Sequence, residues 1–236
     1  MKAPERAELI TRVLAIPEKR FDTTLISYLD ESEIEALLAA PDRDTWTGRR
    51  DHTLLLLAIQ TGLRASELTS LRREDLQLGG GAWVRCRGKG RKERCTPLSH
   101  PTSNALQQWL RERGGQPASP LFPNRSGEHL TRGAIWRLVV KHAATASERC
   151  PSIQTKNITP HTLRHTAAMR MLHAPTPIDI ATIALWLGHE NLDTTNKYVH
   201  ADMELKRRAL DRTAPPNAKP GRYRPPDSLL TFLESL

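Results

Sequence analysis

The hydrophobic and polar positions follow two different periods, and the change between them separates helical stretches from one small sheet. Apolar residues at helical spacing run through residues 27–41, where an acidic cap region begins the segment and a proline ends it. A second, more apolar helix is predicted at 49–62, with Gly62 as its left-handed C-terminal cap. Residues 65–72 continue as a short helix.

Alternation with period two then replaces the helical spacing. It predicts three short strands at 74–78, 82–88 and 93–98, separated by a glycine triplet and by the tight basic loop GKGRK. Helical spacing resumes afterwards, and further helices are predicted at 101–113, 131–148, 160–173, 178–187 and 193–211. The fold class is therefore α+β and predominantly helical, with one small three-stranded antiparallel sheet.

Both ends of the chain differ in composition from this domain. Residues 1–22 are charged, contain two prolines and are predicted to be a linker or a fragment of a helix. Residues 213–226 are rich in proline and basic residues, which is typical of an extended linker, and 227–236 form a short amphipathic helix. That segment would dock on a neighbouring protomer, pack on its own domain or be disordered. The predicted domains are a tail at 1–22, one folded domain at 23–212, and a linker with a helix at 213–236.

The charge of the chain points to a polyanionic partner. Lys and Arg number 35 against 26 Asp and Glu, a formal net charge of +9. Such an excess favours nucleic acid, through counterion release and long-range attraction, although a basic protein without such a partner stays an alternative. The three cysteines form no C-x-x-C pair, so neither a zinc knuckle nor a disulfide framework is indicated, although Cys86 and Cys95 could face each other across a hairpin. No segment has the length and apolarity of a signal peptide or membrane span, so a soluble intracellular protein is expected.

Two stretches near the predicted sheet carry residues that can act on a phosphate. TGLRASEL (61–68) places Arg64 directly after the glycine-capped helix, with Glu67 one turn further on. RGKGRKER (87–94) is a hairpin tip from which Lys89 can reach a phosphate oxygen. Taken singly, the first stretch is better explained by an ordinary surface ion pair, and the second is also explained by a solubilising turn.

A third stretch, HTLRHT (161–166), places His161 and Arg164 three residues apart on one helical face. His165 lies at an angle to that face and also fits a buried structural position. Two histidines four apart can begin a metal site, but a zincin motif needs glutamate where Thr162 stands. No cysteine or acidic cluster supplies further ligands, so no metal is expected.

The fourth stretch, LWLGHENLDTTNKYVH (185–200), is the most informative. An apolar helix ends at Gly188, His189 follows at the turn, and Tyr198 comes nine residues later. A histidine at a helix end and a half-buried tyrosine are each common for structural reasons.

Together these stretches resemble the tyrosine recombinase, or phage integrase, family. TGLRASEL resembles the family's first arginine box, HTLRH its H-x-x-R box, and LGHENLDTTNKYVH its terminal G-H…Y box with the nine-residue gap intact. The resemblance extends over about residues 24–211 and implies a tyrosine-recombinase catalytic domain. It implies a site-specific DNA recombinase, of integrase or transposase type, that cleaves and rejoins DNA through a 3′-phosphotyrosyl intermediate without a cofactor.

The resemblance also implies a role for each residue of the set. The catalytic residues it implies are Arg64, Lys89, His161, Arg164, His189 and Tyr198. Tyr198 would be the nucleophile, which keeps the bond energy in a covalent phosphate ester. The two arginines would hold the non-bridging oxygens through their planar forks, and the lysine would protonate the departing 5′-oxygen.

The remaining roles are supporting ones. His161 and His189 would complete the phosphate pocket, and His161 would assist deprotonation of the tyrosine. Glu67 and His165 would support the pocket. The side chains expected to contact DNA are Arg87, Arg91, Lys92, Arg94 and Lys197.

The partners implied are double-stranded DNA and further copies of the chain, as a tetramer on synapsed DNA and a monomer in solution, with an accessory recombinase subunit possible. The expected location is the prokaryotic cytoplasm, at the nucleoid. Most family members carry a separate DNA-binding domain before the catalytic half, and residues 1–22 are too short for one. The alternatives are a non-catalytic DNA-binding regulator or truncated remnant of the same fold, a type IB topoisomerase, and a metal-dependent nuclease.

Overall fold

The structure is a computed structural model that describes residues 26–88, 93–176, 178–189, 194–196 and 198. All of these belong to the first of two compact units, Met1–Ala201, and the second unit, Asp202–Leu236, lies outside the described residues. Within the described part, every helix is too short or too polar to cross a membrane.

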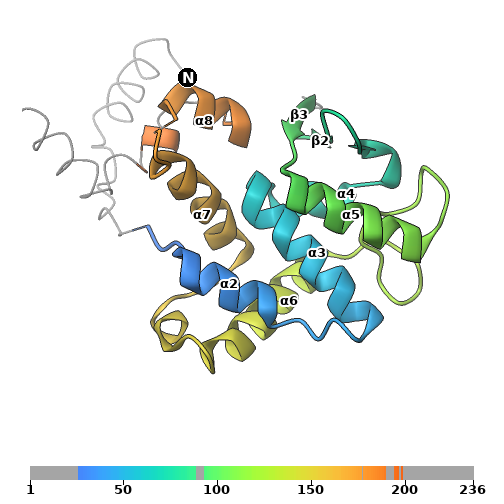
Figure 1. The fold of residues 1–236 in the computed structure, drawn as a ribbon, viewed down its shortest axis with the longest axis horizontal. Coiled ribbons are helices and arrows are strands. Elements are labelled where there is room, and N and C mark those ends of the chain that lie inside the picture. Colours follow the sequence, from blue (N-terminus) through green and yellow to red (C-terminus); the bar gives the residue numbers. More distant parts are fainter. Residues whose placement is uncertain (1–25, 89–92, 177, 190–193, 197, 199–236) are drawn as a thin grey trace, which may run out of the picture. The chain divides into compact units, whose positions relative to one another are not determined.

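Helices form most of the described chain (Figure 1). They are α2 (Glu31–Ala39), α3 (Trp46–Thr61), α4 (Ala65–Ser70), α5 (His100–Arg113), α6 (Arg132–Ser147), α7 (Pro160–Leu172) and α8 (Ile180–Leu187). Two 3-10 helices, Arg73–Asp75 and Pro151–Thr155, connect them. The predominantly helical α+β class is confirmed. Of the helix predicted at 193–211, residues 194–196 and 198 are helical, and the rest lies outside the described residues, as do 1–22 and 213–236.

Side chains at the helix starts explain where the elements begin. Asp30 and Glu33 form a reciprocal capping box at α2, which is the acidic cap that the sequence predicted. Thr159 accepts a hydrogen bond from the Thr162 amide at the start of α7, and Pro160 occupies the first turn, where its missing N–H costs nothing. The H-x-x-R stretch therefore begins directly at a capped helix end.

The sheet has the order β1-β2-β3 and is antiparallel throughout, with strands Leu76–Gln77, Trp83–Arg87 and Glu93–Pro97. The first strand is shorter than predicted because the residues before it form a 3-10 turn, in which Asp75 accepts a hydrogen bond from the Arg72 amide. The suggestion that Cys86 and Cys95 face each other is wrong. Cys86 pairs with Arg94 and is buried, whereas Cys95 lies on the exposed face.

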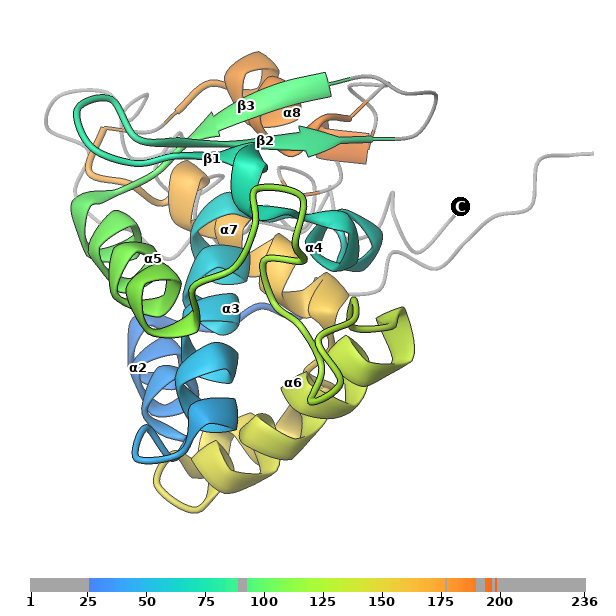
Figure 2. The same cartoon turned by 90° about the vertical axis from the view of Figure 1, so that its right-hand side faces the viewer.

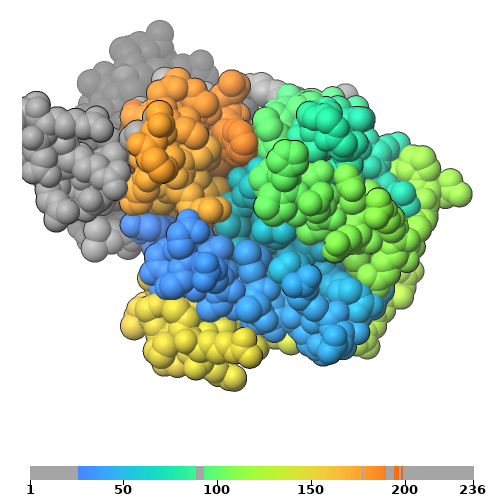
Figure 3. Space-filling model, viewed as in Figure 1, coloured from blue at the N-terminus to red at the C-terminus, as the bar shows by residue number. Residues whose placement is uncertain are grey.

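Helix α3 forms the centre of the core, with α5 on one side and α7 on the other (Figures 1 and 2). Leu54, Leu55 and Leu57 are fully buried, and each such side chain stabilises the fold by about 2 kcal/mol. Figure 3 shows α2, α3 and α5 adjoining on one face of the molecule, with α7 next to α2. The buried packing of α3 fixes the position of its C-terminal turn, where the first arginine box begins.

Candidate active site

Two helix ends that lie against each other form the base of the candidate site. Helix α3 ends at Gly62 with φ of 64°, and α8 ends at Gly188 with φ of 66°, both in the left-handed conformation that favours glycine. A side chain at either position would have to displace a neighbouring side chain. A Cβ on Gly62 would lie 2.5 Å from Leu187 Cδ2, and one on Gly188 would lie 2.8 Å from an Arg94 terminal nitrogen. The glycines of two sequence boxes are therefore required both for chain reversal and for close approach.

Arg164, on α7, joins these two helix ends. It is 3% exposed and donates hydrogen bonds to the Gly62 carbonyl at 2.7 Å and to the Leu187 carbonyl at 2.8 Å. Carbonyls at a helix C-terminus lack partners within the helix and carry partial negative charge, so a cation there is favoured. Burial, followed by the charge of Arg64, lowers the pKa of Arg164 to about 10. The guanidinium therefore stays charged at neutral pH.

Arg64 reaches the same place from the start of α4. It donates to the Gly188 carbonyl at 3.1 Å and to Glu67 Oε1 at 3.2 Å, and its side chain is 41% exposed. A cavity of about 700 Å³ opens in front of both arginines. The side chains along it are mainly basic, hydroxylic or aromatic: Arg64, Ser66, Arg132, Trp136, Thr159, His161 and Arg164. This composition suits a phosphate group.

Glu67 is the buried anion that binds the side chains of both Arg64 and Arg94. It is 2% exposed and accepts hydrogen bonds from the Arg64 amide at 2.8 Å and from Arg94 Nη1 and Nη2 at 2.8 and 2.9 Å. Burial acts to raise the pKa of Glu67, but the hydrogen bonds from Arg94 and from the Arg64 amide outweigh it, and the pKa is lowered. Glu67 is therefore a carboxylate at neutral pH, and it contacts both Arg64 and Arg94.

Arg94 differs from its expected place among DNA-contacting residues. Its side chain is 14% exposed, its two terminal nitrogens bind Glu67, and its Nε donates to the Trp186 carbonyl at 3.1 Å. It thus connects β3 to α4 and to the end of α8. Strand alternation is the signal that indicates this position, because Arg94 shares a face with buried Thr96 and pairs across the sheet with buried Cys86.

We expect Arg94→Ala to lower the free energy of unfolding by about 3 kcal/mol, because it leaves the Glu67 carboxylate buried beside only one remaining cation. Arg87→Ala on the same hairpin is the matched control. Arg87 is exposed and pairs with Glu93 at 2.8 Å, so its loss should cost less than about 1 kcal/mol. Urea denaturation measures both. Equal effects of the two substitutions would contradict the interior role of Arg94.

Tyr198 lies at the centre of a group of rings. It is 2% exposed, and its Oη lies 3.0 Å from His165 Nδ1. The His165 ring meets Tyr198 edge-on at 5.4 Å between centroids, and His161 packs against His165 at 4.2 Å. His189 stacks nearly parallel to Tyr198 at 6.3 Å, and its Nδ1 lies 2.7 Å from the Thr195 hydroxyl. The H-x-x-R box and the terminal box therefore meet in space.

Burial, together with the positive charge nearby, keeps these histidines neutral. Burial, then the charges of nearby arginines, lowers the pKa of His189 to about 4, and desolvation followed by Arg164 and Arg64 lowers the pKa of His161. Burial raises the pKa of Tyr198, while the charges of Arg164 and Arg64 act to lower it. The phenol is thus protonated at rest, within reach of the field of both arginines.

The remaining predicted residues are Arg87 and four residues that the structure does not describe. Arg87 is exposed at the end of β2 and pairs with Glu93. The loop residues Lys89, Arg91 and Lys92 and the C-terminal Lys197 lie outside the described residues. Among the residues that the structure describes, no group of three or more His, Cys, Asp or Glu side chains is arranged to hold a metal ion.

The cavity also contains residues that the sequence analysis did not single out. Arg132 and Trp136, one turn apart on α6, line it, and Trp136 is 49% exposed. Their spacing resembles that of any helix surface, so the sequence offers no signal for them. Only the packing of α6 next to the start of α7 places them beside the arginines.

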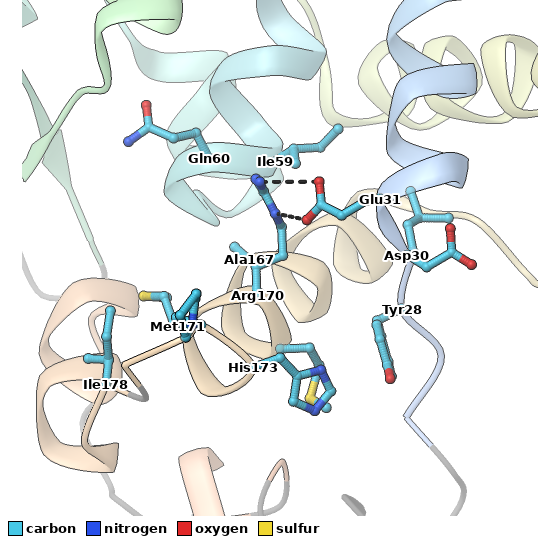
Figure 4. Close-up of a pocket in the computed structure, with 14 residues that line it drawn as sticks. Tyr28, Asp30, Glu31, Ile59, Gln60, Ala167, Arg170, Met171, His173 and Ile178 are labelled. Atoms are coloured by element: carbon cyan, nitrogen blue, oxygen red, sulfur yellow. Dashed lines mark hydrogen bonds and ion pairs between the residues drawn. The ribbon is translucent and has the colours of Figure 1, made fainter. Parts of the chain in front are cut away.

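A separate pocket of about 580 Å³ lies between the start of α2, the end of α3 and the C-terminal half of α7 (Figure 4). Arg170 and Glu31 form an ion pair along it, with Arg170 Nε 2.8 Å from Glu31 Oε1. None of the candidate catalytic side chains lines this pocket. It therefore belongs to a different part of the surface from the arginine-lined cavity.

Comparison with known proteins gives consistent matches. The profile of the phage integrase family matches residues 27–204. A protein of Sinorhizobium fredii, y4rC, whose name assigns it an inferred integrase/recombinase role, is 52% identical over 99% of this chain and 70% of its own length. Tyrosine recombinase XerD of Pseudomonas aeruginosa is 41% identical over 73% of this chain. The match spans 56% of XerD, so the chain covers little more than half of that relative.

Solved structures agree with the sequence relatives. The XerH site-specific recombinase bound to a palindromic difH substrate superposes with a TM-score of 0.68 and 25% identity, over 84% of this chain and 58% of XerH. The XerA recombinase gives a TM-score of 0.67 and 26% identity, over 93% of this chain and 74% of XerA. The fold, the sequence boxes and the matches to relatives all cover the same part of the chain. The chain therefore belongs to the phage integrase family of tyrosine recombinases.

Proposed function

We propose that this chain carries the catalytic machinery of a site-specific DNA recombinase that breaks and rejoins DNA through a 3′-phosphotyrosine. The observation that carries the proposal is the convergence of a buried tyrosine with two arginines from distant segments. Arg164 and Arg64 hold the ends of α3 and α8, and both charges act on the Tyr198 phenol. XerH, a relative of the same fold, has been solved with DNA, which supports DNA as the partner.

The tyrosine suits a reaction that must be reversible without an energy source. Attack of Tyr198 Oη on phosphorus forms an O–P bond while the bond to the 5′-oxygen breaks, so one phosphodiester replaces another. Phenol has an ordinary pKa near 10 and is a better leaving group than an alkoxide. The released 5′-hydroxyl, or that of another strand, then reverses the attack and joins the DNA.

The arginines suit the transition state. The pentacoordinate phosphorus carries negative charge on its non-bridging oxygens, and a planar guanidinium can donate two parallel hydrogen bonds to them. Arg164 is already fixed by two carbonyls and Arg64 by Glu67 and Gly188, so little rearrangement is needed when the charge develops. With this many donors, the proposed reaction needs no metal ion.

His161, His189 and Lys89 complete the proposed mechanism. His161 lines the cavity in front of the arginines, and a phosphate there would favour the protonated, donating form of its ring. His189 adjoins the tyrosine and would donate to the same phosphate. Lys89 would protonate the departing 5′-oxygen, which is a proposal from the family resemblance. We further propose that the active form on synapsed DNA is a tetramer of this chain.

The test is covalent capture on DNA. We expect incubation with nicked suicide substrates, carrying a family core site, to yield a denaturation-resistant adduct on the 3′ side of the break. Peptide mapping should place the nucleotide on Tyr198, and EDTA should leave the yield unchanged. Cleavage without an adduct, or cleavage lost in EDTA, would instead indicate a nuclease. Relaxation of supercoiled plasmid without site preference would indicate a type IB topoisomerase.

A further inference from the structure

We propose that His165, and not His161, is the catalytic residue that takes the proton from Tyr198 Oη during attack on DNA. This inference rests on the proposed function and adds one residue to it. The family resemblance implied only a supporting place for His165 and gave the assisting role to His161. The arrangement of the three rings favours the opposite assignment.

Distance is the first argument. His165 Nδ1 lies 3.0 Å from Tyr198 Oη, within the range required for direct proton transfer. The contact described for the His161 ring is with the His165 ring, at 4.2 Å between centroids. His161 instead lines the cavity with Arg64 and Arg164, where a phosphate would lie. The two histidines, four residues apart on α7, therefore face different reaction partners.

The position of His165 is fixed by its helix. Its neighbour Arg164 is held by the carbonyls of Gly62 and Leu187, and Leu163 and Thr166 on the same turns are buried. On the other side of the phenol, His189 stacks on the Tyr198 ring while its own Nδ1 binds Thr195. Tyr198 is thus enclosed between two histidines, and among the described contacts only that of His165 reaches the reacting oxygen.

The protonation state at rest is also correct for a proton acceptor. Burial, followed by His161 and Arg164, lowers the pKa of His165 to about 4. The groups facing it are His161 and Arg164 from its own helix and Tyr198 from the C-terminal segment. At neutral pH its ring is neutral, and in the tautomer with the proton on Nε2 the lone pair of Nδ1 would face the phenol. A phosphate held by the arginines would partly cancel their charge and raise the affinity of the ring for a proton.

The step balances as a proton transfer coupled to substitution. As the Tyr198 Oη–P bond forms and the P–O5′ bond breaks, the phenol proton moves to His165 Nδ1, and the 5′-oxygen receives a proton from the general acid. In the rejoining step the 5′-hydroxyl loses its proton to that same group, and His165 returns a proton to the phenolate. No net proton, electron or co-reactant is consumed.

The first measurement is the single-turnover rate of adduct formation. His165→Ala should lower this rate by about 100-fold while DNA affinity is retained. The wild-type rate should fall in acid as His165 becomes protonated, and His165→Ala should lack that acid limb. If His165→Ala does not fold, His165→Asn serves instead, since its amide can accept a hydrogen bond but does not titrate.

The second measurement separates proton transfer from positioning. Fluorotyrosine at position 198 has a more acidic phenol and depends less on a base, so the loss caused by His165→Ala should shrink to less than about 10-fold. The loss caused by His161→Ala should stay the same with either phenol. Added imidazole should partly restore the rate of adduct formation in His165→Gly.

The outcomes are distinguishable. Absence of any adduct in the wild type would overturn the proposed function itself. An adduct that forms as fast in His165→Ala as in the wild type would overturn only the assignment of His165. The assignment of His165 would also be overturned if its substitution slowed adduct formation but neither fluorotyrosine nor imidazole reduced that loss. Such a result would mean that His165 only positions the phenol.

Discussion

Tyr198→Phe should form no covalent adduct with DNA, a loss of at least about 10,000-fold in the rate of strand cleavage. The phenyl ring keeps the volume and the stacking against His189, and only Oη is removed. That atom is the nucleophile in the proposed reaction, and no water can replace it without losing the bond energy needed for rejoining. Denaturing gels of suicide-substrate reactions measure the adduct directly.

Folding and binding should survive this substitution. The hydrogen bond lost is the one to His165, which accounts for about 1 kcal/mol, so the variant should unfold at nearly the wild-type denaturant concentration. Tyr28→Phe is the matched control, because Tyr28 lines the separate pocket of Figure 4 and not the candidate active site. This substitution should leave cleavage unchanged. An adduct that persists in Tyr198→Phe would end the assignment of the nucleophile.

Arg164→Ala should reduce cleavage by about 100-fold or more, because it removes a preorganised donor to the transition state. Arg164→Lys should recover little of this loss, since an ammonium cannot hold two carbonyls and also present a planar fork to the phosphate. Single-turnover rates on suicide DNA test both variants. A cleavage rate close to that of the wild type in Arg164→Lys would contradict this, because it would show that positive charge alone at position 164 suffices for cleavage.

Arg164→Ala should also destabilise the fold, which provides a second readout. It leaves the carbonyls of Gly62 and Leu187 without their buried donor, at a cost of about 1–3 kcal/mol each. Arg170→Ala, six residues later on the same helix, is the control. Arg170 is 43% exposed and pairs with Glu31, so its removal should change stability by less than about 1 kcal/mol and leave cleavage intact.

Helices, caps and boxes were predictable because their causes are local. The acidic start of α2, the capped start of α7 and the glycine ends of α3 and α8 each depend on residues within one or two turns. The strand alternation that places Arg94 inward is equally local, although the basic run around it favoured a solvent-facing interpretation. The domain limits at 22, 23, 212 and 213 stay predictions, because they lie outside the described residues.

The sequence by itself determined the family, the helical class and the identity of the chemically able side chains, because periodicity, glycine turns and motif spacing are properties of short segments. Only the tertiary structure decided what those side chains touch. Arg164 donates to the carbonyl of Gly62, which lies 102 positions away in the sequence. Arg94 binds Glu67, 27 positions away, and Tyr198 contacts His165, 33 positions away. Which partner a buried cation or phenol binds depends on how helices pack, and helix packing is set by the whole core and not by the spacing within any one box.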